Sequence, residues 1–432
     1  YQVSDRRLRR VPGRSGGRRK GERRRRRSTM ALLGSLCSRA RAGQRHLASV
    51  ATLLRCAEAH PQPTPPVSPP TCGRSTDAPP DIGLSDVVRA EMMIRDGIVD
   101  TPTVTSNTFS KLLGCDTYFK ADFLQESGSF KERGARNALL HLSPEQREAG
   151  VVAASAGNHA LALSYHGREL GIPITVVMPE FAPITKVMNC EGYGAQVVLH
   201  GEHILDAASH AAEVYQDGLG MTYINGFDHP DVIAGAGTMA LEMLRQVPNI
   251  DYLVIPVGGG GLLAGMALAA KELQPGIKVI AVEPINAASL TAAVAAGAPV
   301  HRHVVPTLAD GLAVPRVGDN AFRLIERYVD KVVTVDEELI ALAILRLMEM
   351  HKFVVEGGGA TGLAALLDDT LLPEVRGSRV AVPLCGGNID APVLGRVIER
   401  GLATDHRLVR FSAKVPDRPG GGARLHELIG AA

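Results

Sequence analysis

Residues 127–135 read Ser127-Gly128-Ser129-Phe130-Lys131-Glu132-Arg133-Gly134-Ala135 and place one lysine at the start of a predicted helix. Ser129 is a favourable N-cap, and Glu132 completes a capping box three residues later. Lys131 would then lie in the first turn, where the positive end of the helix dipole disfavours an ammonium group. In a dry site both effects would lower its pKa and favour the neutral, nucleophilic amine; a solvated surface lysine is the alternative.

The pattern S-G-S-F-K-x-R-G in this stretch resembles the segment that carries the Schiff-base lysine in pyridoxal-phosphate enzymes of fold type II, the tryptophan-synthase-β group. Within that group it is most similar to the threonine and serine dehydratases and the serine racemases. The resemblance runs from about Leu84 to Arg400, in several motifs that keep the family's order. It implies that pyridoxal 5′-phosphate is the cofactor, that Lys131 is the catalytic residue, and that Phe130 and Lys131 bind the cofactor.

Apolar runs along the chain predict an α/β fold. Short, nearly continuous apolar strands are expected at residues 117–120, 150–154, 174–178, 196–199, 252–257, 279–282 and 379–384, with helical segments between them. Such runs are typical of parallel strands covered by helices on both faces. The resemblance adds two domains, each with an open, mostly parallel sheet: a large cofactor-binding domain of residues 82–149 and 229–402, and a small domain of residues 150–228.

Residues 1–81 differ in composition from the rest and are expected to be a disordered extension. Residues 1–29 have a net charge of +11; since the whole chain carries +2, the remainder carries −9. A basic run can bind nucleic acid, but this one lacks aromatic residues and precedes the first methionine, Met30, so untranslated sequence is the better interpretation. The segment from Met30 to Cys56 has the composition of a mitochondrial transit peptide, and residues 60–81 form a proline-rich linker. We therefore expect a location in the cytoplasm or the mitochondrion.

The six cysteines form no C-x-x-C pair and are too widely spaced for a disulfide framework. A reducing compartment without a cysteine metal site is expected. No apolar run approaches the roughly 18 residues of a membrane span, so neither membrane nor nucleic acid is expected as a partner.

A second motif, Ser155-Ala156-Gly157-Asn158-His159, follows the strand predicted at residues 150–154. Helix N–H groups after such a strand face the edge where open α/β sheets bind ligands, although an ordinary strand-to-helix turn is the alternative. The resemblance implies that Asn158 binds the 3′-oxygen of the cofactor, and that Ser155 and backbone groups of Ala156, Gly157 and His159 hold the substrate carboxylate. Serine racemases carry a serine at position 156 that exchanges a proton opposite the lysine. Ala156 has no such proton, so elimination is favoured over racemisation.

Four glycines, Gly258, Gly259, Gly260 and Gly261, precede a predicted helix that begins at Leu262. Their backbone can approach an anion closely, and the helix N-terminus supplies free N–H donors, so a phosphate site is predicted. A dinucleotide site is a competing interpretation, because G-x-G-x-x-A also fits here and Glu283 ends a strand at the expected distance. The resemblance assigns the glycines and Leu262 to the cofactor phosphate, and a nicotinamide enzyme has no use for the lysine and asparagine motifs.

Cys385 lies at the end of an apolar strand, in Leu384-Cys385-Gly386-Gly387-Asn388. A cysteine there is ordinarily a small buried residue. In the dehydratases this position contacts the pyridine nitrogen through a neutral group, which leaves the ring a weaker electron sink and favours prompt β-elimination. Gly311 and Glu356 lie in further dehydratase-like segments near the cofactor, as do Asn225-Gly226-Phe227-Asp228 and residues 235–238.

Two features concern ligands other than the cofactor. Glu283 matches a carboxylate that binds a divalent cation in the racemase branch, but the acidic partner six residues later is Ser289 here, so a monovalent or divalent cation stays an open expectation.

Residues 403–432 resemble the first strand, turn and helix of an ACT domain, a regulatory module, of which only about the first half is present.

The sequence thus predicts a pyridoxal-phosphate-dependent L-threonine and L-serine ammonia-lyase that forms 2-oxobutanoate or pyruvate and ammonia. Serine racemase is the alternative enzyme. A catalytically inactive protein that binds the cofactor or senses amino acids is the alternative of another class. The expected partners are a small amino-acid substrate and further copies of the chain, as a dimer or tetramer.

Overall fold

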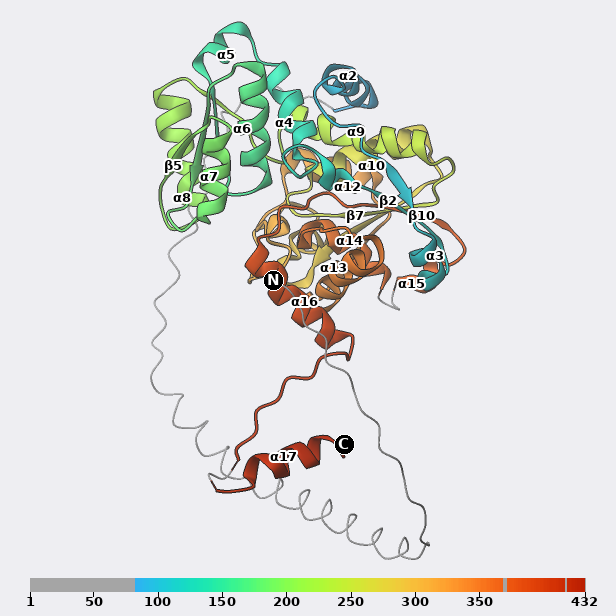
Figure 1. Cartoon of the computed structure of the whole chain (residues 1–432). Helices are drawn as coiled ribbons and strands as arrows, with labels where there is room; N and C mark the ends of the chain where they lie inside the picture. The colour runs from blue at the N-terminus through green and yellow to red at the C-terminus, as the bar shows by residue number, and fades with distance from the viewer. Residues whose placement is uncertain (1–81, 368–370, 416–417, 432) are drawn as a thin grey trace, which may run out of the picture. The chain divides into compact units, whose positions relative to one another are not determined.

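The computed structural model describes residues 82–367, 371–415 and 418–431 (Figure 1). The basic segment, the candidate transit peptide and the proline-rich linker lie outside these residues. The described residues form two mainly parallel sheets covered by helices, which confirms the predicted α/β fold. The domain boundaries stay a prediction.

The larger sheet has six strands in the order β1-β2-β10-β7-β8-β9. Its strands are β1 (Thr103–Thr105), β2 (Asp116–Lys120), β7 (Tyr252–Pro256), β8 (Lys278–Pro284), β9 (Lys331–Val335) and β10 (Arg379–Pro383). Only β1, at the edge, is antiparallel to its neighbour. Because β2, β10 and β7 are adjacent and parallel, the segments that follow them begin at one edge of the sheet.

The smaller sheet has four parallel strands in the order β5-β4-β3-β6. Its strands are β3 (Val151–Ala154), β4 (Ile174–Met178), β5 (Gln196–Leu199) and β6 (Thr222–Tyr223). The seven strands expected from apolar runs are all present, within two residues at each end. The strands β1, β6 and β9 were not among those expected from the sequence.

Helices connect the strands and cover both sheets. In the first half of the described chain they are α2 (Leu84–Ile94), α3 (Asn107–Leu113), η1 (Asp122–Leu124), α4 (Lys131–Leu140), α5 (Pro144–Ala149), α6 (Asn158–Leu170), α7 (Ile184–Gly192), α8 (Ile204–His210), η2 (Ala211–Gly218) and α9 (Pro230–Gln246). In the second half they are α10 (Gly261–Leu273), η3 (Ile285–Ala287), α11 (Ser289–Ala296), η4 (Asp310–Leu312), α12 (Asp319–Tyr328), α13 (Glu337–His351), α14 (Gly357–Leu366), α15 (Leu372–Val375), α16 (Ala391–Thr404) and α17 (Gly421–Ile429).

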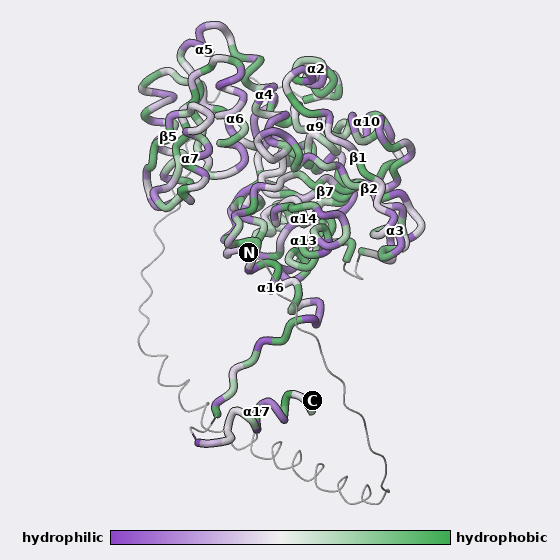
Figure 2. Tube along the Cα trace, viewed as in Figure 1, coloured by the Kyte–Doolittle hydropathy of each residue, from purple (hydrophilic) through white to green (hydrophobic). Residues whose placement is uncertain are grey.

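Successive strand residues of the larger sheet are buried on opposite faces. Leu253 and Ile255 of β7 pack in one hydrophobic core with α9, α10 and α12. Val254, between them, packs in another with α3, α13 and α14. Figure 2 colours most of β7 as hydrophobic. Burial on both faces explains why the sequence shows a continuous apolar run rather than alternation.

Glycines let the backbones of α4 and α9 approach each other closely. A Cβ atom added to Gly134 would lie 2.8 Å from the main-chain oxygen of Val232. One added to Gly235 would lie 2.5 Å from the main-chain oxygen of Arg133. Neither contact can be relieved by turning a side chain, so both positions require glycine for this helix crossing.

A buried network of charges joins α4 to the larger sheet and to α9. The Arg133 guanidinium donates to both carboxylate oxygens of Asp122 at 2.7 and 2.8 Å. It also donates to both oxygens of Glu242 at 2.7 and 2.8 Å. Lys120, at the end of β2, donates to Glu242 at 2.5 Å. Burial raises the pKa of Asp122, but Arg133 outweighs it, so the pKa is lowered overall. Two cations and two anions therefore balance in the interior.

The C-terminal segment differs in part from the ACT-like prediction. Helix α17 is present, but the structure assigns no strand to residues 406–415. Val409 and Phe411 there are 79% and 60% exposed. A strand needs a neighbour for its backbone hydrogen bonds, and none of the described strands pairs with this segment. The structure therefore assigns the helix but no strand to this segment, and the ACT-like resemblance stays a prediction.

Within the described residues, no helix is both long enough and apolar enough to cross a membrane.

We expect the Arg133 network to contribute strongly to stability. Arg133→Met leaves Asp122 and Glu242 without their main cation, so the free energy of unfolding, measured by urea denaturation, should fall by roughly 3–5 kcal/mol. Lys331→Met is the matched control, because it breaks the exposed Lys331–Glu374 pair at 2.6 Å and should cost at most about 1 kcal/mol. Equal losses in the two variants would contradict the prediction.

Candidate functional site

Lys131 is the first residue of α4 and points its amine into a partly buried space. Its Nζ donates a hydrogen bond to the main-chain oxygen of Gly226 and lies 5.2 Å from the centre of the Phe130 ring. Burial lowers the pKa of Lys131 to about 8, while Cys385 and Glu356 act in the opposite direction. Near neutral pH a much larger share of this amine is therefore neutral and nucleophilic than in an ordinary lysine.

The predicted capping box at the start of α4 is wrong. Phe130, not Ser129, occupies the N-cap position, and the Ser129 hydroxyl has no hydrogen-bond partner among the described residues. The carboxylate of Glu132 accepts from the main-chain N–H of Ser127 instead. The reason lies in the segment after β10, since Ser129 forms a bridge with Gly386 and the Phe130 N–H donates to the Cys385 oxygen at 2.9 Å. Backbone pairing thus sets the start of the helix.

The loop of Asn158 follows β3 and leads into α6. Ser155 Oγ accepts from the Gly157 N–H at 3.3 Å, and the N–H groups of the first turn of α6 supply donors and positive potential. Ala156 is partly buried and packs against the hydrophobic core around the smaller sheet. The amide of Asn158 donates from Nδ2 to Glu356 Oε1 at 2.7 Å. The loop therefore offers donors for an anion next to an amide donor.

His159 is buried and neutral in the structure. Its Nε2 lies 3.0 Å from the Ile224 main-chain oxygen, and the ring packs against Gly226, where an added Cβ would lie 2.9 Å from it. Burial, with a contribution from Lys131, lowers the pKa of His159 to about 3. Because Nε2 is used by the Ile224 oxygen and the ring packs against Gly226, we assign the predicted substrate contact to the backbone N–H of His159.

The glycine run follows β7 and begins α10. Gly260 has φ of 98°, which strongly favours glycine. A Cβ at Gly259 would lie 2.3 Å from the Phe227 ring, and one at Gly258 would lie 2.9 Å from the Leu312 backbone. Leu262 is buried in the first turn of α10. The run is thus a closely packed backbone cradle at a helix N-terminus, as an anion site requires.

Cys385 and Glu356 lie on the remaining side of the site. Burial raises the pKa of the Cys385 thiol, so it is neutral at physiological pH. Burial, reinforced by Asp310, raises the pKa of Glu356 to about 7, although the bond from Asn158 acts in the other direction. Gly311 lies beside this carboxylate, since a Cβ there would be 3.9 Å from Oε1.

Glu283 has a structural role in the described residues. Its carboxylate accepts from the N–H groups of Leu290 and Thr291 at 2.6 and 2.8 Å and from the Thr291 hydroxyl at 2.7 Å. Its side chain is fully buried, which also removes it from a dinucleotide ribose. No group of three or more His, Cys, Asp or Glu side chains among the described residues could hold a metal. The predicted cation role of Glu283 thus has no support here.

Two further residues of the site had no role assigned from the sequence. Asn388 donates from Nδ2 to Asn158 Oδ1 at 2.9 Å and to the Ser127 oxygen at 2.8 Å. Asp228 accepts from the N–H groups of Asp319 and Ala321 at 3.0 Å each and so fixes the loop that contains Gly226. Both residues lie within sequence motifs described above. Their hydrogen-bond partners are far away in the sequence, so the motifs do not reveal these contacts.

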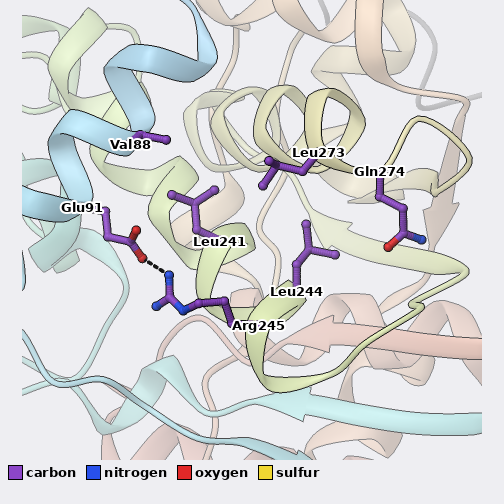
Figure 3. Close-up of a pocket in the computed structure, with 7 residues that line it drawn as sticks. All are labelled: Val88, Glu91, Leu241, Leu244, Arg245, Leu273 and Gln274. Atoms are coloured by element: carbon purple, nitrogen blue, oxygen red, sulfur yellow. Dashed lines mark hydrogen bonds and ion pairs between the residues drawn. The ribbon is translucent and has the colours of Figure 1, made fainter.

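A separate surface pocket lies between α2, α9 and α10 (Figure 3). It has a volume of about 340 Å³, its lining is mainly apolar, and an ion pair between Arg245 and Glu91 crosses one side. It contains no residue of the candidate site, so we assign the chemistry to the surroundings of Lys131.

These surroundings fit the expected cofactor. They combine a lysine amine with a lowered pKa, an amide donor, a neutral thiol and a backbone cradle for a phosphate. The donors come from the ends of β2, β3, β7 and β10, which the fold brings together. Lys131, Asn158, the glycine run and Cys385 would hold pyridoxal phosphate.

Comparisons with known proteins identify a family that uses the expected cofactor. The family described as pyridoxal-phosphate dependent enzyme matches residues 94–386. The L-threonine ammonia-lyase of Thermotoga maritima is 43% identical over 349 residues, 81% of this chain and 85% of that protein. Among solved structures, threonine deaminase isoform 2 from Solanum lycopersicum matches with a TM-score of 0.70 and 34% identity, covering 78% of this chain and 98% of that one. Serine racemase from Dictyostelium discoideum matches with a TM-score of 0.67 and 38% identity, covering 72% and 100%.

The lowered pKa of Lys131 predicts how uptake of the cofactor depends on pH. The rate at which apoprotein binds pyridoxal phosphate covalently, followed by visible absorbance, should rise with pH and reach half of its maximum at about pH 8. It should level off roughly one pH unit higher, because nearly all of the amine is then neutral. An ordinary lysine would continue to rise to about 10.4. Apoprotein with Lys131→Ala gives the background from other lysines. A rate that still climbs steeply above about pH 9 would contradict the assignment.

Proposed function

Because the chain belongs to the family of pyridoxal-phosphate dependent enzymes, we propose that it is an L-threonine and L-serine ammonia-lyase. It converts these amino acids to 2-oxobutanoate or pyruvate and ammonia. The observation that carries the proposal is the buried Lys131 amine, with its pKa lowered to about 8, between the Asn158 loop and the glycine run. Relatives at 43% and 42% identity that bear the name L-threonine ammonia-lyase support the substrate class.

Each part of the site has a separate task in this reaction. Pyridoxal phosphate, when bound, supplies an electron sink for the electrons left on the substrate α-carbon. Lys131 Nζ removes the α-proton, for which its lowered pKa suits it. The N–H groups at the start of α6 and the Ser155 hydroxyl orient the substrate carboxylate, and the N-terminus of α10 binds the phosphate.

The neutral thiol of Cys385 is consistent with elimination. Its raised pKa means that no negative charge from this residue draws a proton to the pyridine nitrogen. A neutral Cys385 beside the bound cofactor would therefore favour prompt loss of the β-hydroxyl. The net reaction loses water from the amino acid, takes water up again and releases ammonia.

The cellular location and the oligomeric state of the protein are predicted from its sequence alone. We expect the cytoplasm or the mitochondrion, and a homo-oligomer. We expect no nucleic-acid or membrane partner.

Product assays test the reaction directly. Purified protein with added pyridoxal phosphate should release ammonia and keto acid in equal amounts from L-threonine and from L-serine. Lys131→Ala should lower the rate by at least roughly 10²–10⁴-fold, because the positioned base is lost. A protein that binds the cofactor but releases neither product would support the sensing alternative instead.

Serine racemisation is the second candidate, because a serine racemase structure matches the chain with 38% identity. The residue at position 156 distinguishes the two reactions, since alanine cannot give a proton to the face opposite Lys131. We expect L-serine to yield pyruvate with little D-serine, and Ala156→Ser to gain D-serine formation while it keeps some lyase activity. Chiral chromatography beside a pyruvate assay measures both. Equal rates of D-serine and pyruvate formation in the unaltered protein would favour the racemase.

A further inference from the structure

Two asparagine amides connect the lysine segment to the proposed cofactor site. Asn388 follows β10, Asn158 begins α6, and Ser127 precedes the lysine helix. Asn388 Nδ2 donates to the Ser127 oxygen at 2.8 Å and to Asn158 Oδ1 at 2.9 Å. Asn158 Nδ2 donates to Glu356 Oε1 at 2.7 Å. The three bonds form one continuous chain from backbone to carboxylate.

The direction of every bond in this chain follows from its first member. The oxygen of Ser127 is a main-chain carbonyl and can only accept, so Asn388 must turn its NH₂ group toward it. The second N–H of that group then points to the amide of Asn158. Of the two ends of that amide, only the Oδ1 atom can accept the hydrogen bond. Asn158 is thereby left with Nδ2 on the opposite side, as a donor.

The neighbouring backbone leaves room for this arrangement. Gly128, with φ of 80°, faces Asn388, and a Cβ there would lie 2.3 Å from Asn388 Oδ1. A Cβ at Gly386 would lie 2.1 Å from Glu356 Oε1 and 3.2 Å from Asn158 Nδ2. Lys186 of α7 donates to the main-chain oxygen of Asn388 at 2.7 Å and holds its backbone.

We propose that Asn388 is a positioning residue, which fixes the amide of Asn158 so that Nδ2 and not Oδ1 faces the 3′-oxygen of bound pyridoxal phosphate. The two ends of an asparagine amide have nearly the same shape, so packing alone does not select one orientation. A donor at the 3′-oxygen stabilises its ionised form, and an acceptor there stabilises the protonated form. The inference rests on the proposed role of Asn158 but not on the identity of the amino-acid substrate.

Asn388→Asp tests the orientation with little change in shape. A carboxylate cannot donate, so it loses the bond to Ser127 and attracts Nδ2 of Asn158, which turns Oδ1 toward the cofactor. At fixed pH, the ratio of the longer-wavelength to the shorter-wavelength visible band of the loaded protein should fall by roughly tenfold, about one pKa unit. Asn388→Ala removes both bonds without adding a charge and should lower the ratio less.

A double variant separates positioning from general damage. In an Asn158→Ala background, Asn388→Asp should cause no further change in the band ratio, because the amide through which it acts is gone. Asn286→Asp is the matched control, since Asn286 Nδ2 also donates to a main-chain oxygen, that of Pro306 at 2.8 Å; its band ratio should equal that of the unaltered protein.

An unchanged ratio in Asn388→Asp and Asn388→Ala, or the same fall with and without Asn158, would overturn the proposal. These spectra are read without substrate. A protein that shows the expected band ratios but releases no ammonia would overturn the proposed reaction alone, whereas an active protein with unaffected bands would overturn the positioning role alone.

Discussion

The ion pairs of Arg133 with Asp122 and Glu242 determine where the lysine helix lies. All three side chains are almost completely buried, and a buried guanidinium without fixed partners would be very costly. One partner comes from the segment after β2 and the other from α9. Since Lys131 is only two residues from Arg133 on the same short helix, satisfying the guanidinium also fixes the amine relative to the larger sheet.

The parallel strands bring the other groups to that amine. Segments after β2, β10 and β7 begin at one edge of the larger sheet, and the loop after β3 of the smaller sheet meets them there through the hydrogen bond between Asn158 and Glu356. Burial disfavours the charged form of a side chain, so it lowers the pKa of a base and raises the pKa of an acid. It lowers the pKa of Lys131 to about 8 and raises that of Glu356 to about 7. A site with little net charge and a reactive amine results from the fold itself.

The sequence predicts the parts of this structure that depend on local pattern. Buried strands such as β4 appear as apolar runs, and the glycines at 258–261 appear as an anion-binding turn. Prediction from the sequence fails where a residue far away in the chain determines the local structure. Ser129 is an example, because its backbone pairs with Gly386 and its side chain does not cap the helix. Asn388 and Asp228 were quoted within motifs without a role, because their partners lie up to 261 residues away. Glu283 was matched to a cation ligand only by resemblance, and its bonds to the start of α11 become visible only in the structure.

The close approach of α4 to α9 limits how this protein can diversify. Gly134 and Gly235 touch the opposing backbone, so even alanine at either position would displace the helix that carries the lysine. Gly157 is different, because a Cβ added there meets no atom within 4 Å among the described residues. Mutations that alter which amino acid is accepted can therefore accumulate in the loop before α6, while the chemistry at Lys131 is inherited unchanged.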